Sequence, residues 1–275
     1  MKFARFVMAL LIALLPLVFM GRTALAAAPS NDTLPGATAV TIGFSQTLDT
    51  TQATTDSDDT QLNASCGAPA TDASVWYAFT AVADVGVVVD VSSSNYSAGI
   101  LVGKGAQGNL ELLECGPSTV FFNAAAGTTY YVLAFDDQGD GGGNGGSLHI
   151  SFTQAPPPPT VDITVNRTGT VDAHTGIATI SGTYTCSNGS SLEAFVDASQ
   201  KVGNGRNATI FGSGSFLDSG TCNGAPHTWS AAVVPDSGKF AGGKSMTVTF
   251  AFACGAVQCT EGYTEQTVQL RGGRK

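Results

Sequence analysis

The sequence has few charged residues: Lys, Arg, Asp and Glu together make up 12% of its 275 residues, about half of the share usual in globular proteins. No segment after the N-terminus carries an apolar stripe with a 3.6-residue period, so we expect almost no helix. Catalytic signatures such as Gly-x-Ser-x-Gly and His-Glu-x-x-His are also missing. These absences argue against a helical protein, and we expect that the protein is not an enzyme.

In place of charged residues the sequence has many small or β-branched ones, with 34 glycines among abundant Thr, Ser, Ala and Val. This composition suits short strands joined by tight turns, because β-branched side chains pack well on a pleated surface and glycine accepts turn conformations. The sequence therefore predicts an all-β fold.

The N-terminus has the pattern of a secretory signal peptide. Lys2 and Arg5 precede the apolar run Phe6–Phe19, and small residues follow up to Ala24-Leu25-Ala26. The run is shorter than the roughly 20 residues that a membrane-spanning helix needs. We expect residues 1–28 to be cleaved and the protein to be secreted to the extracellular space, without a membrane span.

Four consecutive prolines, Pro156–Pro159, favour an extended segment without strand pairing. We therefore expect two domains, 29–153 and 161–275, joined by a Pro-rich linker over 154–160. Residues 29–155 contain thirteen acidic residues and one basic residue, a net charge of −12, whereas residues 160–275 contain eight of each. The acidic first part disfavours nucleic acid as a partner; the oligomeric state stays open.

The first domain shows about eight strand patterns separated by turn formers, which is typical of a β-sandwich and here predicts a jelly roll. The expected strands are Ala39–Leu48, Val75–Thr80, Val85–Val91, Ile100–Val102, Leu110–Glu114, Val120–Phe122, Thr129–Phe135 and Leu148–Phe152. Trp76 and Tyr77 alternate on one strand, as do Tyr130 and Tyr131, so one of each pair can face outward and stack against a sugar ring.

The second domain shows about seven strand patterns, which predict an immunoglobulin-like sandwich. They are Val161–Val165, Ala178–Cys186, Leu192–Ala198, Ala208–Phe216, Thr228–Val234, Met246–Cys254 and Gln266–Leu270. In Met246–Cys254, large apolar residues alternate with Thr and Ala, which predicts a strand with one buried face.

Two stretches resemble known families. Asn31-Asp32, the block Ser74–Thr80 and the block Ala125–Val132 resemble the bacterial pre-peptidase C-terminal domain over about 31–153. Such domains are jelly-roll-like accessories of secreted hydrolases, and some bind polymers or calcium. Gly182–Cys186, Cys222–Trp229 and Ala253-Cys254 with Cys259 make about 161–271 similar to small secreted bacterial Ig-like domains of unknown function. These resemblances imply folds and an extracellular location, but no activity.

The sequence contains 6 cysteines, and an even number in an exported chain indicates disulfides rather than a zinc site. Cys66 and Cys115 are the two in the first domain and should pair. In the second domain, one interpretation pairs Cys186 with Cys222 and Cys254 with Cys259. The alternative pairs Cys186 with Cys254, whose positions in their strands point both inward.

The loop 136–146 is the candidate metal site. Asp136, Asp137, Asp140 and Asn144 could offer oxygen ligands to calcium, although the loop does not match an EF-hand; the competing interpretation is a solvated hairpin tip. No other cofactor is indicated. The acidic run Asp56–Asp59 is interpreted as a solvated loop, and none of His149, His174 and His227 lies in a catalytic motif.

Together these observations predict a secreted, non-catalytic, two-domain β protein that binds an extracellular polysaccharide, a protein polymer or a cell-surface partner. Two alternatives stay open. One is a purely structural, envelope-associated protein. The other is a secreted hydrolase whose site is assembled from residues distant in the sequence.

Overall fold

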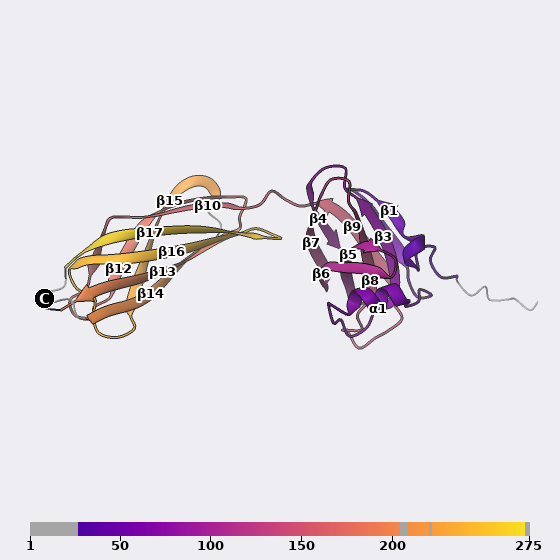
Figure 1. The fold of residues 1–275 in the computed structure, drawn as a ribbon, viewed down its shortest axis with the longest axis horizontal. Coiled ribbons are helices and arrows are strands. Elements are labelled where there is room, and N and C mark those ends of the chain that lie inside the picture. The colour runs from indigo at the N-terminus through magenta and orange to yellow at the C-terminus, as the bar shows by residue number, and fades with distance from the viewer. Residues whose placement is uncertain (1–26, 204–207, 220–221, 273–275) are drawn as a thin grey trace, which may run out of the picture.

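The computed structural model describes residues 27–203, 208–219 and 222–272, and the chain is all-β as predicted. Most of the predicted signal peptide lies outside the described residues. Figure 1 shows strands β1–β9 and strands β10–β17 as two groups, joined by residues 155–159, which form no strand. No described helix is long and apolar enough to cross a membrane.

Strands β1–β9 form two sheets. A five-stranded sheet has the order β1-β3-β8-β5-β6 and a four-stranded sheet has the order β2-β9-β4-β7. The strands are β1 (Thr38–Val40), β2 (Ser45–Asp49), β3 (Asp72–Thr80), β4 (Val85–Asp90), β5 (Ala98–Ala106), β6 (Asn109–Pro117), β7 (Thr119–Ala124), β8 (Thr129–Asp136) and β9 (Ser147–Gln154).

The prediction of one continuous strand over Ala39–Leu48 was wrong. The chain turns at Gly43, which has φ +90°, so β1 joins the five-stranded sheet and β2 joins the four-stranded sheet. Glycine adopts this left-handed conformation without the steric cost that other residues incur. Splitting the strand lets the chain contribute to both layers.

The five-stranded sheet is buried on both faces, so neither Trp76 nor Tyr77 faces solvent, contrary to the prediction. Tyr77 joins the core between the two sheets, together with Val132 and Phe152. Trp76 points the opposite way, into a second apolar cluster with Leu62 of helix α1 (Ser57–Asn63). Helix α1 and the neighbouring loops thus give this sheet a cover of its own.

The acidic run Asp56–Asp59 is not a solvated loop, because it starts helix α1. Asp56 is the N-cap, and its carboxylate accepts hydrogen bonds from the backbone N–H groups of Asp58 and Asp59. The Asp59 carboxylate returns a contact by accepting from the Asp56 N–H at 3.0 Å. This reciprocal pattern is a capping box, with Asp in the position that Glu or Gln usually takes.

Strands β10–β17 form one eight-stranded sheet that closes on itself. The strands are β10 (Thr160–Val165), β11 (Thr168–Val171), β12 (Ala178–Ser187), β13 (Ser191–Val202), β14 (Ala208–Ser219), β15 (Asn223–Pro235), β16 (Gly243–Cys254) and β17 (Cys259–Arg271). Strand β12 pairs with β15 as well as with β10 and β11, which completes the ring. The sequence patterns did not reveal β11.

The expected second sandwich of two separate sheets is therefore joined into a barrel. The joint is a short pairing of β14 with β15, where Gly212 lies opposite Pro235. A Cβ on Gly212 would lie 2.4 Å from the Val234 carbonyl oxygen, and one on Gly214 would lie 2.4 Å from that of Ala232. Glycine at these two positions permits the close approach of the strands.

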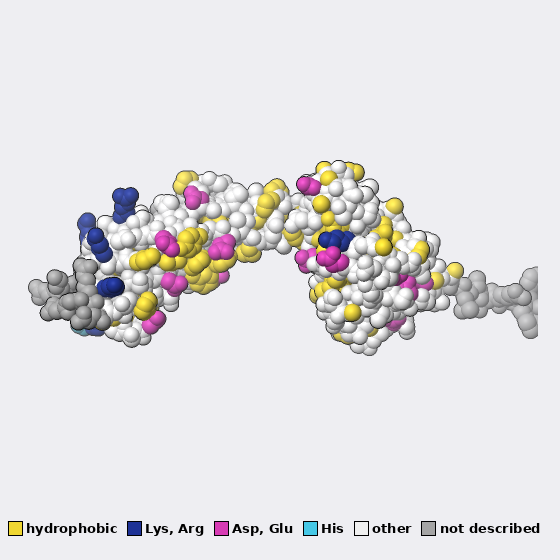
Figure 2. All heavy atoms as spheres, in the orientation of Figure 1, with side chains coloured by type: hydrophobic (Ala, Val, Ile, Leu, Met, Phe, Trp, Pro, Cys, Tyr) yellow, Lys and Arg dark blue, Asp and Glu magenta, His cyan; other side chains and the backbone are white. Residues whose placement is uncertain are grey.

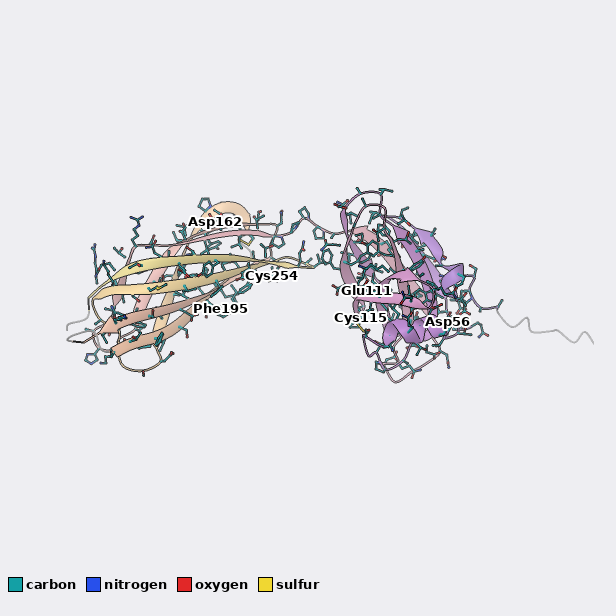
Figure 3. All side chains as sticks on the ribbon, in the orientation of Figure 1. Asp56, Glu111, Cys115, Asp162, Phe195 and Cys254 are labelled. Carbon is teal, nitrogen blue, oxygen red and sulfur yellow. A yellow bond between two sulfur atoms is a disulfide. The ribbon has the colours of Figure 1, made fainter. Side chains whose placement is uncertain are left out.

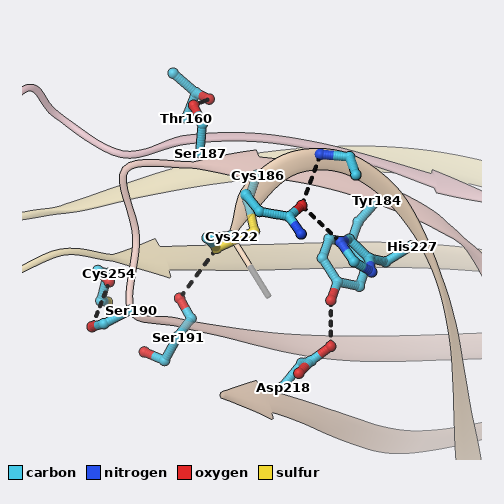
Figure 4. The surroundings of a disulfide bond; sticks show 12 residues. Thr160, Tyr184, Cys186, Ser187, Ser190, Ser191, Asp218, Cys222, His227 and Cys254 are labelled. Atoms are coloured by element: carbon cyan, nitrogen blue, oxygen red, sulfur yellow. Dashed lines mark hydrogen bonds between the residues drawn. A yellow bond between two sulfur atoms is a disulfide. The ribbon is translucent and has the colours of Figure 1, made fainter. Parts of the chain in front are cut away.

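Three disulfides link Cys66 to Cys115, Cys186 to Cys222 and Cys254 to Cys259. Figure 4 shows the second of these beside the contact of the Tyr184 hydroxyl with Asp218. Of the two pairings left open by the sequence, the structure has the one in which Cys254 bonds to Cys259. The alternative fails because Cys254 lies on the outward-facing side of β16, directly opposite Cys259 of β17.

Removing a disulfide should destabilise the protein more when the disulfide closes a longer loop. The sequence separation is 49 for Cys66–Cys115 and 5 for Cys254–Cys259. In the chain-entropy description, C66A/C115A should lower the free energy of unfolding by about 4 kcal/mol and C254A/C259A by about 2 kcal/mol. Urea denaturation of the two double variants and the wild type measures this. A larger loss in C254A/C259A would contradict the expectation.

Candidate functional site

Strand β16 turns its large side chains outward. Its buried positions hold small or hydroxyl-bearing residues, among them Thr247, Thr249 and Ala251, each with no exposed surface. Phe250 and Phe252 lie on the other side and are half-buried. The alternation predicted from the sequence is present, but the Thr and Ala face is the buried one.

The neighbouring strands extend this outward face. Phe250 lies between Phe195 of β13 and Tyr263 of β17 in the sheet register. Phe195 is 42% exposed and Tyr263 is 54% exposed. We call Phe195, Phe250, Phe252 and Tyr263 the aromatic face; Figure 3 labels Phe195 on its strand.

The rings of the aromatic face contact one another. The ring centroids of Phe250 and Tyr263 are 5.2 Å apart and those of Phe195 and Phe252 are 6.3 Å apart, both with tilted or edge-on geometry. Aromatic pairs prefer such offset and edge arrangements, which add about 0.5–1.5 kcal/mol beyond area burial. The rings therefore form two contacting pairs on one face of the sheet rather than four independent side chains.

Four carboxylates flank the rings. Phe252 lies between Glu193 and Glu261 in the register, and Val248 lies between Asp197 and Glu265. Figure 2 shows this apolar surface dotted with acidic side chains. No ion pair among the described residues involves these four side chains. The Tyr263 hydroxyl donates a hydrogen bond to Glu265, which raises the pKa of Tyr263.

Of the four residues of the predicted calcium site, Asp136 ends β8 and the other three lie on the loop between β8 and β9. Three of the four side chains accept hydrogen bonds from backbone amides. The Asp136 side chain is buried and accepts from the N–H groups of Gln138 and Gly145 at 2.8 and 2.9 Å. Asp137 and Asp140 accept from Gly139 and Gly142 in the same way.

Asn144, the fourth predicted ligand, has φ +75°, and its N–H donates to Asp72 at 3.0 Å. Among the described residues no group of three or more His, Cys, Asp or Glu side chains is placed to hold a metal ion. The loop residues thus shape a crossover from the five-stranded to the four-stranded sheet, so the interpretation as a hairpin tip was wrong. Calcium binding there stays a prediction.

The three histidines lie apart from one another. The His149 ring contacts Thr47 Oγ1 at 3.0 Å, and the His227 ring contacts Asn223 Oδ1 at 3.1 Å and stacks on Tyr184. His174 lies in the turn between β11 and β12. Among the described residues, no histidine ring is hydrogen-bonded to a carboxylate.

Asp59, which belongs to the acidic run expected to be solvated, is a buried carboxylate. Asp59 accepts hydrogen bonds from Ser74 Oγ at 2.5 Å and from Trp76 Nε1 at 2.9 Å. Burial raises the pKa of Asp59 to about 7, although these hydrogen bonds and the one from the Asp56 N–H act in the opposite direction. The network ties helix α1 to strand β3 and has no open surface, so its role is structural.

The second half of the chain matches a family of proteins. Residues 159–253 match the family of unknown function DUF6299. The match begins at the last proline of the Pro156–Pro159 run and includes β10–β15 and most of β16, but not β17. No curated protein matches the chain.

Solved structures that the chain is similar to include bacterial glycosidases. A GH2 β-galacturonidase from Eisenbergiella tayi aligns with 72% of this chain and 35% of its own, at 9% identity and a TM-score of 0.24. A β-glucuronidase from Bifidobacterium dentium aligns with 72% and 39%, at 11% identity and a TM-score of 0.23. The chain thus spans 35% and 39% of the lengths of these two enzymes, and likeness at this level assigns no activity to it.

The Asp59 network predicts a pH-dependent stability. The unperturbed pKa of 3.8 is raised to about 7 in the folded state, so between these values the folded protein holds more protons than the unfolded chain. The free energy of unfolding should therefore fall between pH 4 and pH 7, by on the order of 2–4 kcal/mol.

Urea denaturation at pH 4, 5.5 and 7.5 measures this dependence. D59N should flatten the fall, whereas D84N, at an exposed loop carboxylate, should keep the wild-type profile. An unchanged slope in D59N would contradict the assignment.

Proposed function

We propose that this protein is a secreted, non-catalytic β protein that binds an extracellular polymer or a cell-surface partner through the aromatic face. Secretion is supported by the N-terminal signal pattern and by three disulfides, which persist in oxidising compartments. We also propose that the chain folds as two domains.

Separate hydrophobic cores support the two-domain organisation. One cluster collects residues between Val40 and Phe152, and another collects residues between Ile163 and Leu270. We assign the first part to a jelly-roll-like domain similar to the pre-peptidase C-terminal domain. The linker is then 155–159 rather than the predicted 154–160, because Gln154 ends β9 and Thr160 begins β10.

The second part we assign to an Ig-like domain, which its strand pairing supports. Strand β12 pairs with β15, β13 pairs with β16, and β11 pairs in parallel with β17. In an immunoglobulin sandwich, whose strands are lettered from A to G, these correspond to the pairing of B with E, of C with F and of the first strand with G.

The observation that carries the binding proposal is the outward orientation of the aromatic residues on three adjacent strands. Contiguous apolar surface is unfavourable in water, and on a secreted protein it commonly marks a surface that a partner covers. Strands β13 and β16 are paired on both sides at the aromatic residues, and β17 pairs with β16 along the stretch that carries Tyr263. The surface is therefore rigid, which lowers the entropy lost on binding.

A sheet surface suits an extended ligand better than an enclosed small molecule. The rings of Phe195, Phe250 and Tyr263 form one row across three strands, so neighbouring units of a polymer could stack on neighbouring rings. The flanking carboxylates can accept hydrogen bonds from hydroxyl or amino groups of the same units. No covalent chemistry is needed for this role, which is why we propose a non-catalytic protein.

Co-sedimentation with chitin, cellulose, bacterial cell wall and collagen tests the proposal. The chain from residue 29 should bind at least one of them saturably, and F195S/Y263S should bind it at least about tenfold more weakly because two stacking partners are lost. Circular dichroism should show an unchanged fold, and urea denaturation should show a loss of about 1–3 kcal/mol, because the variant removes both ring pairs.

A matched control is F211S. Phe211 is 58% exposed on β14, but it lies in the row of Ser199 and Met246, outside the aromatic face. F211S should bind like the wild type. Absence of binding to all four polymers, or equal loss in F211S and F195S/Y263S, would overturn the proposal.

A further inference from the structure

The cationic side chains of the second half gather at one end of the barrel. The described residues include six Lys and Arg, and all but Lys104 belong to this end: Arg167, Lys201, Lys239, Lys244 and Arg271. Each lies in or beside a strand end or loop on the side opposite the Cys254–Cys259 hairpin. Figure 2 shows dark-blue side chains concentrated at this end. The net charge of zero for residues 160–275 thus conceals a separation of charge.

A cavity lies among these cations. Its volume is about 980 Å³, and Lys201, Lys239 and Lys244 line it together with Gln200 and Ser245. No Asp or Glu is among its lining residues. The volume is at the upper end of the range of about 300–1,000 Å³ that is typical of ligand sites.

The framework of the cavity is fixed by buried polar contacts. The side-chain amide of Gln200 is buried and makes two hydrogen bonds to the backbone of Ala241, each 2.8 Å long. Ser245 Oγ is also buried and donates to the Ser199 carbonyl oxygen at 3.0 Å. The Gln200 contacts hold the loop between β15 and β16, which carries Lys239, and the Ser245 contact joins β16 to β13.

The same loop is also held from the opposite side. The Phe240 N–H donates to the Gly176 carbonyl oxygen at 3.2 Å, and Lys239 Nζ donates to the His174 carbonyl oxygen. Gly176 has φ +77°, and a Cβ there would lie 2.5 Å from the Lys239 Cβ. The backbone at Lys239 is therefore packed tightly against the turn at 172–176.

The carboxylates at this end do not neutralise the lysines. Asp172 accepts from the N–H groups of His174 and Thr175, which lower its pKa, and Asp236 lies at the end of β15. No ion pair among the described residues involves either of them or the three lysines. Lys201 is four residues along β13 from Asp197, roughly 13 Å in a strand, which exceeds the screening length of about 8 Å at physiological salt.

From these observations we propose that the end cavity binds a ligand that carries several phosphate groups. Lysine ammonium groups bind phosphate oxygens as point charges, and three of them converge on one cavity without a competing acidic lining residue. A ligand with at least three negative charges would neutralise them. The phosphates could belong to a free polyphosphate or to lipid headgroups.

Isothermal titration calorimetry with sodium tripolyphosphate tests the site on the chain from residue 29. Binding should weaken between 50 and 300 mM NaCl, because it depends on charge. K201A/K239A/K244A should lose at least about tenfold in affinity, a difference of about 1.4 kcal/mol. K201A/K244A keeps the contact of Lys239 with His174 and should lose several-fold in affinity. A loss in this variant cannot be attributed to displacement of the loop that carries Lys239. K104A is the matched control, since Lys104 pairs with Glu111 at 3.5 Å outside the barrel.

Sedimentation with vesicles of phosphatidylcholine containing phosphatidylglycerol distinguishes the two sources. Vesicle binding that tripolyphosphate displaces would support the site and identify lipid headgroups, whereas binding of tripolyphosphate alone would support it and identify a free ligand. The proposal is overturned if neither probe binds, or if the triple lysine variant binds as well as the wild type.

Discussion

The narrow interior of the closed sheet is the constraint on which the second half of the molecule depends. A ring of strands leaves room inside for side chains of limited size, and the buried positions of β13 and β16 accordingly hold Ala194, Ala251 and Ala253 among other small residues. The Phe residues of these strands lie on the outer surface, whereas Leu192 and Val196 of β13 are buried. Even Thr249 is placed inside, where its hydroxyl has no hydrogen-bond partner among the described residues. The aromatic face is thus the counterpart of the small side chains that β16 places inside, while other strands supply large core residues such as Tyr184 and Trp229.

The first half meets the opposite problem, because its five-stranded sheet must be covered on two sides. Strand β3 carries aromatic residues on both faces, and the side without a partner sheet is closed by helix α1 and its loops. The Trp76 indole N–H is buried there and donates to Asp59. Asn31 adds a further link by donating to the Trp76 carbonyl oxygen at 3.0 Å. An acidic segment therefore acts as a structural cover.

Strand patterns and disulfides were predictable because they depend on local alternation and on cysteines that are few and well separated. The positions of nearly all strands follow from the sequence for this reason, and one of the two open cysteine pairings is the one observed. For β16, the sequence did not show which of the two alternating sets of side chains is buried. Alternation of Phe250 with Thr249 and Ala251 shows that there are two faces, whereas the choice between them depends on barrel closure through β14 and β15. The acidic run at Asp56 misled for a similar reason, since its burial depends on Trp76 and Ser74, distant in the sequence.

The basic end and the acidic side of the barrel also restrict how copies of this protein can meet. A two-fold axis that sets each patch against itself would oppose like charges, so an electrostatic contact between copies pairs the basic end of one copy with the acidic side of the other. Where the rotation between copies does not close, such contacts leave one unpaired surface on each terminal copy and extend head to tail. Because exposed charges are screened by salt, any chain of copies held in this way would shorten as ionic strength rises.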